Sequence, residues 1–295
     1  MQTLESLSRK IQTAQELLGV VKTMKSLAAV SIRQYERAVE SLEAYRGVID
    51  AGWQALLRSG RGTVPESPMT GAVCMVIASD QGMCGQFNEA ILNHALNQVP
   101  MFTKDVPEIV FWTFGDKLKG ALKDAGYAEE AHFAIPGSLS SIRTRVQEVI
   151  QRIEQYRSKQ GIERFYVCHN STSERGIYRQ ICTRLLPLDT AWALGHAKKK
   201  WPTRCLPLIG LPPDDMFKHL FRQHLFVFLF RSFAQSMAGE NAARLMAMQA
   251  AEKNILELLE GLRAGFRELR QTAITAELLD IISGFEAVSS DFSGL

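Results

Sequence analysis

The stretch "SRKIQTAQELLGVVKTMKSLAA" (residues 8–29) places apolar residues at alternating steps of three and four, and this spacing continues on both sides of it. A mean spacing of about 3.5 residues predicts a left-handed coiled coil, since the stripe of a helix lying on a globule follows the period of about 3.6 residues. Fourteen of the sixteen repeat positions are apolar, and Lys25 and Arg46 are the exceptions. The positions are Leu4, Leu7, Ile11, Ala14, Leu18, Val21, Lys25, Ala28, Ile32, Tyr35, Val39, Leu42, Arg46, Ile49, Trp53 and Leu56.

Proline, the residue that most reliably interrupts a helix, is confined to the middle of the chain. All ten prolines lie between Pro65 and Pro213, so residues 1–64 and 214–295 can each form a long helix. The C-terminal segment carries a similar repeat, which slips once after Ala273. Its positions are Leu245, Met248, Glu252, Ile255, Leu259, Leu262, Phe266, Leu269 and Ala273, then Ile274, Leu278, Ile281, Phe285 and Val288. We expect the two end helices to pair antiparallel; pairing between two copies of the chain is the alternative.

The segment between the two helices changes from helical to strand-like periodicity. Apolar, β-rich runs alternate with helical stretches, which predicts a small α/β domain with a mainly parallel sheet. The expected strands are 71–79, 108–115 and 164–170, and the expected helices are 88–99, 116–126 and 141–161. The predicted fold class is therefore α+β: a long antiparallel coiled coil with an inserted Rossmann-like α/β domain. The expected boundaries are 1–64 for the first helix, 65–213 for the domain and 214–295 for the last helix.

Composition excludes several functional classes. Hydrophobic residues at 46% and charged residues at 22% are ordinary for a globular protein, and a net charge of +3 is too small to indicate a nucleic-acid partner. The five cysteines show no C-x-x-C pair or nearby histidine cluster, which indicates neither a disulfide framework nor a zinc site and favours a reducing cytosol. The N-terminus does not resemble a leader peptide, and the apolar run 225–230 is too short to cross a membrane.

The glycine-containing stretch "SDQGMCGQFN" (residues 79–88) follows the first expected strand and predicts a strand-to-helix turn, with Gly82 and Gly85 supplying backbone freedom. It matches neither the dinucleotide fingerprint nor the P-loop, so phosphate binding is the weaker interpretation. Cys84 has no nearby histidine in sequence and is interpreted as a buried small residue rather than a nucleophile. We expect no catalytic residue, no cofactor and no metal site.

Three blocks of sequence resemble the γ subunits of F-type ATP synthases over nearly the full length. Residues 8–29 resemble the opening helix of that family, with its K-x-M-K core. Residues 79–88 are similar to the family's "SDRGLCGGFN" type of turn and depart from it at Gln81, Met83 and Gln86. A weaker match, "QICTRLLPLD" (180–189), resembles the segment that closes the α/β domain.

The third block is the most specific. The segments "SMAGENAARLMAMQAAEKN" (236–254) and "RQTAITAELLDIISGFEAV" (270–288) resemble the family's C-terminal signature. Phe285 stands where alanine is usual, and eight residues follow Ala287, where many members stop. These departures favour a divergent branch, such as an alternate or sodium-linked bacterial enzyme. The residues that match the signature are Ile274, Thr275, Glu277, Asp280 and Gly284.

The resemblance implies a non-catalytic central-stalk rotor that couples ion flow to ATP synthesis or hydrolysis in the β subunits. The implied partners are the α and β subunits, the ε subunit and the c-ring, and the implied location is peripheral, at the cytoplasmic face of a bacterial membrane. Two alternatives remain open: a nucleotide-binding enzyme whose helices form a dimerisation stalk, and a coiled-coil adaptor without ATPase partners.

Site residues are likewise carried over by the resemblance. The implied contacts to α and β are Lys22, Met24, Lys25, Arg270, Gln271, Thr275, Glu277 and Asp280. Lys25 has a simpler alternative as a register-setting polar residue, and Glu277 and Asp280 as part of a solvated helix face. Residues 271–295 contain no Lys or Arg, which suits a surface that must turn without adhering.

The expected c-ring-facing foot comprises Leu211, which stands about where a carboxylate is common in the family, together with Asp214 and Asp215. The two aspartates either take over that carboxylate's role or serve the start of the last helix, where acids are favourable.

Overall fold

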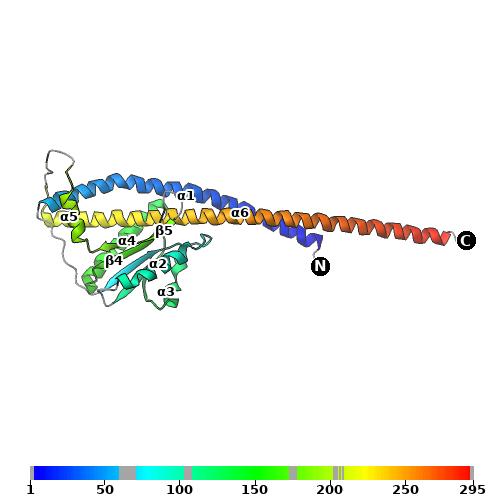
Figure 1. Cartoon of the computed structure of the whole chain (residues 1–295), viewed down its shortest axis with the longest axis horizontal. Helices are drawn as coiled ribbons and strands as arrows, with labels where there is room; N and C mark the ends of the chain where they lie inside the picture. The colour runs from blue at the N-terminus through cyan, green and yellow to red at the C-terminus, as the bar shows by residue number, and fades with distance from the viewer. Residues whose placement is uncertain are drawn as a thin grey trace. The chain divides into compact units, whose positions relative to one another are not determined.

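The computed structural model describes residues 3–59, 71–102, 108–172, 178–201, 205, 207 and 209–292, without the side chains of 190 and 284–292. Two compact units are present: the smaller combines residues 1–27 with 247–295, and the larger comprises 28–246. The helices α1 (Leu4–Arg58) and α6 (Pro213–Phe292) both contribute to each unit (Figure 1). The prediction of a long helix at each end of the chain is confirmed.

A sheet forms the centre of the larger unit. In the described part of this unit it has five strands in the order β3-β2-β1-β4-β5. β1 lies parallel to β2 and β4, β2 lies parallel to β3, and only β5 is antiparallel. The mainly parallel sheet is as predicted. The bounds are β1 (Ala72–Ile77), β2 (Ile109–Phe114), β3 (Glu129–Phe133), β4 (Arg164–Thr172) and β5 (Tyr178–Leu186).

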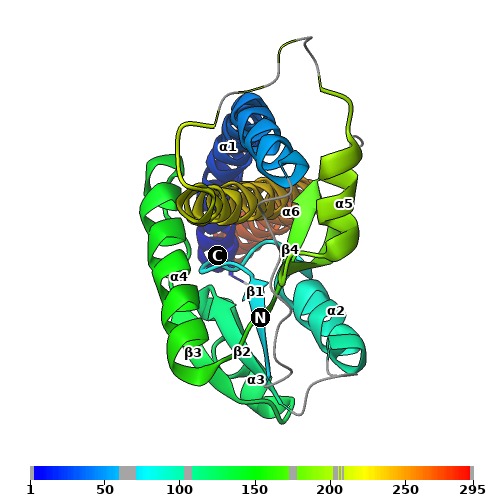
Figure 2. The ribbon, with the colours of Figure 1, turned by 90° about the vertical axis from the view of Figure 1, so that its left-hand side faces the viewer.

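Helices cover both faces of this sheet (Figure 2). β1 is buried along its whole length: Val73 and Met75 face the core shared with α4, α6 and α1, whereas Cys74 and Val76 face α2. Burial on both faces explains why the strand is a continuous apolar run rather than an alternating one. The helices between the ends are α2 (Phe87–Phe102), the one-turn α3 (Ala121–Asp124), α4 (Leu139–Gln160) and α5 (Thr190–Lys198), with a 3₁₀ turn at Asp116–Leu118.

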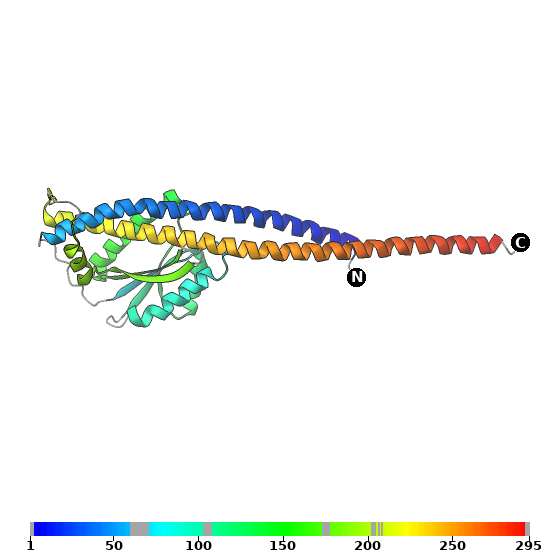
Figure 3. The same cartoon turned by 45° about the horizontal axis from the view of Figure 1, so that its top comes forward.

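Within the larger unit, α1 and α6 pair antiparallel (Figure 3). The Tyr45 hydroxyl donates to Gln223 Oε1 at 2.7 Å, and Glu43, earlier in α1, pairs with Arg231, later in α6, at 3.0 Å. The predicted seam residues Tyr35, Ile49, Trp53 and Leu56 are buried in the core shared with α6. In this unit, the apolar seam of α1 is therefore covered by α6 of the same chain. No helix in the described ranges has the length and hydropathy needed to cross a bilayer.

Two elements of the α/β domain depart from expectation. The helix predicted over 116–126 is wrong as a continuous element, because Gly120 takes a left-handed conformation (φ 86°) between the 3₁₀ turn and α3. Strands β3 and β5 were not predicted, since neither carries the long apolar run of a doubly buried strand. Both lie at the edges of the sheet.

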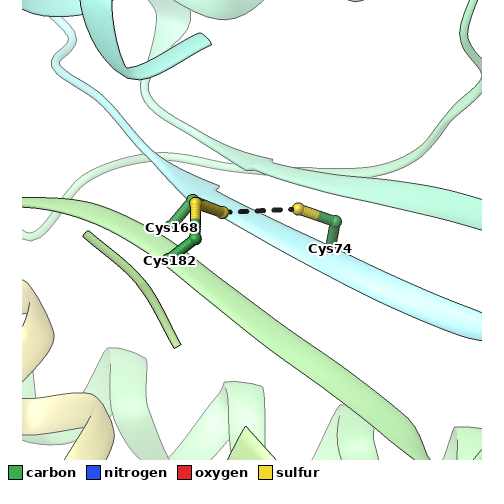
Figure 4. Close-up of a disulfide and its surroundings, with 3 residues drawn as sticks. All are labelled: Cys74, Cys168 and Cys182. Atoms are coloured by element: carbon green, nitrogen blue, oxygen red, sulfur yellow. Dashed lines mark hydrogen bonds between the residues drawn. A yellow bond between two sulfur atoms is a disulfide. The ribbon is translucent and has the colours of Figure 1, made fainter. Parts of the chain in front are cut away.

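The interpretation of the cysteines is also wrong for one pair. β5 runs back along β4 and places Cys182 directly opposite Cys168, where the two form a disulfide with Cα atoms 4.1 Å apart (Figure 4). The Sγ atom of Cys74 on β1 lies 3.7 Å from that of Cys168. Cysteine count and spacing could not reveal this pair, because it depends on the unpredicted strand β5.

Gly115, directly after β2, lies in close contact with the backbone of Ser79 at the start of the turn after β1. Its φ is 107°, and a Cβ atom there would lie 2.7 Å from the backbone oxygen of Ser79. We predict that Gly115→Ala lowers the free energy of unfolding by more than about 2 kcal/mol, through backbone strain and the clash. Urea denaturation of the full chain followed by circular dichroism measures this loss.

The matched control is Gly120→Ala, which has a similar positive φ but open space around the new Cβ. It should cost only about 1 kcal/mol, from strain alone. Equal losses in the two variants would contradict the close-contact explanation.

Candidate functional site

The turn at residues 79–88 is held by its own polar groups. The backbone N–H of Ser79 donates to Asn88 Oδ1 at 3.0 Å, and the Ser79 hydroxyl hydrogen-bonds within the turn, to Gln81 O at 2.8 Å. Gly85 adopts a left-handed conformation as expected (φ 58°), but the second left-handed residue is Met83 (φ 60°) and not Gly82. The turn is therefore a folded structural element.

Cys84 is buried at the centre of this turn, at 1% exposure. Burial raises the pKa of its thiol, against the opposing effect of a hydrogen bond with Ser79. A raised pKa disfavours the thiolate that a nucleophile requires. This agrees with the interpretation of Cys84 as a buried small residue.

The crevice that doubly wound domains use for ligands is filled by α6. Such ligands bind beyond the carboxyl ends of the strands where the strand order reverses, which here is between β1 and β4. The Ser236 hydroxyl donates to the carbonyl of Ile77, the last residue of β1, at 3.4 Å. A Cβ atom on Gly239 would lie 3.5 Å from the ring of Phe87, the first residue of α2. The packing of α6 thus argues against the nucleotide-binding alternative at this position.

A charged pair is buried beside the turn. Glu240 and Arg244 lie one helical turn apart on α6, each 9% exposed, with Oε1 and Nη2 2.6 Å apart. Burial raises the pKa of Glu240, and Arg244 opposes that shift. Burial raises the pKa of the Tyr35 phenol as it does that of the Cys84 thiol, and the nearby Glu240 carboxylate adds to both shifts. This part of block 236–254 therefore has a packing role that sequence reasoning did not assign.

In the smaller unit, Lys25, a polar residue in the apolar seam of α1, contacts Glu252, the polar residue in the seam of α6. Lys25 Nζ donates to Glu252 Oε2, with side-chain exposures of 33% and 18%. The hydrogen bond from Lys25 lowers the pKa of Glu252, and Lys22 contributes to the lowering. Glu252 was visible in the sequence as the polar member of the second seam. This pairing fits the register-setting interpretation of Lys25, while its contact with partner subunits stays a prediction, as do those of Lys22 and Met24.

The C-terminal part of α6 in the smaller unit is exposed over residues 270–283. Its large apolar side chains are about half exposed or more: Ile274 48%, Leu278 55%, Leu279 58%, Ile281 62% and Ile282 54%. The expectation that these seam positions pack on the first helix is wrong, because α6 continues past the start of α1 (Figure 3). Phe285 and Val288 lie outside the described side chains.

The predicted contact residues of this segment are all exposed: Arg270, Gln271, Thr275, Glu277 and Asp280. The Thr275 hydroxyl donates to the carbonyl of Gln271 at 2.9 Å, and this bond is internal to the helix. A concentration of exposed apolar side chains marks an interaction surface. On the isolated chain, this segment is thus available for contact with a partner.

The predicted foot residues lie at the start of α6 and, for Leu211, two residues before it. Leu211 is 54% exposed, and Asp214 and Asp215 occupy the first turn of α6, where negative charge stabilises the helix. Asp215 also pairs with Lys218 at 3.7 Å. This position suits the helix-start interpretation, and contact with a ring of partner subunits stays a prediction.

The chain matches the family model described as ATP synthase over residues 3–288. The chain belongs to the ATP synthase family. Among curated relatives, the ATP synthase gamma chain of Geobacter metallireducens (strain ATCC 53774 / DSM 7210 / GS-15) is 26% identical, covering 98% of this chain and 99% of the relative. The gamma chain of Dechloromonas aromatica (strain RCB) is 24% identical, covering 96% and 99%.

Solved structures show the same fold. The rotor of the Euglena gracilis mitochondrial ATP synthase matches with a TM-score of 0.64 at 13% identity, covering 92% of this chain and 98% of that one. The central stalk and c-ring structure of the Tetrahymena thermophila mitochondrial ATP synthase contains a chain that matches with a TM-score of 0.56 at 17% identity, covering 79% and 99%. The predicted combination of paired long helices and an inserted α/β domain is confirmed.

We predict that the Lys25–Glu252 pair sets the register of the helices in the smaller unit. Lys25→Glu should lower the melting temperature of the full chain, because it places two carboxylates together in a half-buried seam. Adding Glu252→Lys should restore most of the loss, since the reversed pair is again complementary. Differential scanning calorimetry of the two single variants and the double variant measures the coupling.

The pair has no coupling if the decrease in melting temperature of the double variant equals the sum of the decreases in the two single variants. The exposed pair Arg9 and Glu5 on α1 offers a matched charge-reversal control, for which little effect is expected.

Proposed function

We infer that the chain is the central-stalk rotor subunit of an F-type ATP synthase, coupling ion flow in the membrane sector to ATP synthesis or hydrolysis. The full-length match to the ATP synthase family carries this inference. Curated relatives named as gamma chains support it along their whole length. The chain itself is non-catalytic, and its partners are the α and β subunits, the ε subunit and the c-ring.

The filled crevice supports a non-catalytic role. The α/β domain has the strand order of nucleotide-binding folds, yet Ser236 and Gly239 of α6 lie where a nucleotide would enter. The domain therefore serves as a rigid body joined to α6. Such a body can transmit torque without binding nucleotide.

The exposed end of α6 is the proposed bearing surface. From residue 271 onward the sequence contains no Lys or Arg and four acids, so few charges are available for strong attachment to a surrounding wall. Its apolar side chains are exposed on the isolated chain and would contact the inside of the α/β hexamer. Rotation biases the hexamer's catalytic subunits among alternative conformations.

Specific partner contacts extend this proposal. Toward the α and β subunits the proposed residues are Lys22, Met24, Lys25, Arg270, Gln271, Thr275, Glu277 and Asp280, all at least partly exposed. Toward the c-ring they are Leu211, Asp214 and Asp215 at the start of α6.

The cellular location of the chain and its branch of the family are part of the same proposal. We place the chain at the cytoplasmic face of a bacterial membrane, held peripherally through the c-ring. Identity of 24–26% to the gamma chains of the two Geobacter relatives supports a divergent branch, and an alternate or sodium-linked enzyme is our proposal for it. We also retain the division into 1–64, 65–213 and 214–295 as the functional partition of shaft and foot.

Leu278→Lys tests the bearing surface. Leu278 is 55% exposed, so the substitution should shift the melting temperature of the isolated chain by no more than about 2 °C. In the assembled complex the lysine would face an apolar wall without a partner, and ATP-driven ion pumping should fall severalfold. Pumping in reconstituted vesicles and ATP hydrolysis are measured together.

Met101→Lys is the matched control, because Met101 at the end of α2 is 74% exposed and lies outside the proposed bearing. It should leave pumping unchanged. Normal pumping by the Leu278→Lys complex, or equal effects of both substitutions, would contradict the bearing role.

A further inference from the structure

Two side chains of the short helix α5, Trp192 and His196, attach it to the long helices in the larger unit (Figure 2). The Trp192 ring packs edge-on against the rings of Trp53 on α1 and His224 on α6, with centroids 5.4 and 5.3 Å apart. One helical turn later, His196 Nε2 lies 3.6 Å from Oδ1 of Asp50 on α1. None of the residues proposed above to contact partner subunits belongs to this attachment.

Both ring nitrogens of His196 face oxygen atoms that only accept hydrogen bonds. Nδ1 lies 3.0 Å from the backbone carbonyl oxygen of Trp192, and Nε2 faces the Asp50 carboxylate. A neutral imidazole carries a single N–H, so one of its nitrogens would direct a lone pair at an acceptor. The protonated ring carries an N–H on each nitrogen and suits both oxygens. The geometry of this contact therefore matches the protonated form.

The charges around the pair act in the same direction. The interaction with Asp50 raises the pKa of His196, against the opposing effects of burial and of the positive charge of Lys199. His196 in turn lowers the pKa of Asp50, against burial, and Arg46 adds to the lowering from 3.8 Å. Burial lowers the pKa of His224 to about 4, so this neighbouring ring is neutral near pH 7. Both members of the pair are charged between the lowered pKa of Asp50 and the raised pKa of His196.

The direction of the pH effect follows from these shifts. A histidine whose pKa is raised on folding contributes its full stabilisation below the unfolded value of about 6.5, and this contribution is lost as the pH rises through the folded value. The contribution of Asp50, whose pKa is lowered, is lost only as the pH falls through that lowered value. The contact between α5 and α1 is therefore weakened by mildly alkaline solution.

We propose that the His196–Asp50 pair is a pH-sensitive switch, which holds α5 against α1 while His196 is protonated and loosens α5 when the proton is lost. The start of α5 stays tied to β5, because its N-cap Asp189 pairs with Arg184 at 3.0 Å. The switch acts within the chain itself and does not depend on the partner subunits proposed above.

An NMR titration of the histidine Cε1–H signals of the full chain measures the proton on His196 directly. The signal that is missing from the spectrum of His196→Gln identifies this residue. Its pKa should lie above the ordinary value of about 6.5, and Asp50→Asn should lower it. A pKa of His196 at or below about 6.5 in the wild-type chain overturns the proposal.

Amide hydrogen exchange of α5, followed by mass spectrometry and corrected for the intrinsic effect of pH, measures the loosening. Between about pH 6 and about pH 9, protection of α5 should fall about fivefold, the upper end of what such an ion pair contributes. Protection of α4 should stay unchanged over the same range, which separates local loosening of α5 from unfolding of the domain.

Variants assign this change to the pair. His196→Gln provides an amide that donates to Asp50 without titrating, so the pH-dependent change in α5 should disappear. Asp50→Asn should also abolish it, because an amide can accept from the protonated ring or donate to the neutral one. His219→Gln is the matched control, since His219 is an exposed histidine of α6, and it should leave the change intact.

Melting temperatures establish that each variant is folded. The proposal is overturned if the protection of α5 in the wild-type chain does not change with pH. It is also overturned if His196→Gln and Asp50→Asn retain the change that the His219→Gln control shows.

Discussion

The packing of one helix, α6, against both the sheet and α1 is the interaction on which the larger unit depends. Phe233 and Ala234 are fully buried between these elements, and burial of a side chain such as Phe233 contributes roughly 1.5–3 kcal/mol. The same helix covers one face of the sheet, fills the crevice at the carboxyl ends of β1 and β4, and supplies the partner for Trp53 of α1. Because α6 forms part of the core of the α/β domain, α6 and the domain must rotate together. This packing is the physical basis for a rigid connection between the long helices and the domain.

Polar residues at selected places define how the long helices meet. An apolar seam alone permits sliding by one repeat, because each repeat offers nearly equivalent apolar contacts. Lys25 and Glu252 interrupt the two seams of the smaller unit and meet each other, so other registers would leave both charges without a partner. In the larger unit, Glu43 with Arg231 and Tyr45 with Gln223 add directional contacts. The end of α6 lacks such partners, and its exposed Leu278 and Ile281 suit a surface completed by other subunits.

Sequence reasoning was most successful where one local pattern determined the structure. The proline-free ends predicted α1 and α6, and the apolar runs at 71–79, 108–115 and 164–170 predicted the buried strands β1, β2 and β4. The edge strands β3 and β5 were missed because their burial is partial, and the disulfide between Cys168 and Cys182 was missed with β5. The exposed end of α6 was identified through family resemblance, since its repeat alone predicted a buried seam.

The composition of the native assembly tests the rotor assignment most directly. The complex would be purified gently from membranes through a tag on this chain, and its mass and subunits read by native mass spectrometry. A rotor subunit should be recovered as a single copy together with a hexamer of two alternating nucleotide-binding subunits and a membrane ring. Recovery of the chain as a homodimer, without ATPase subunits, would contradict the rotor assignment and favour a structural adaptor.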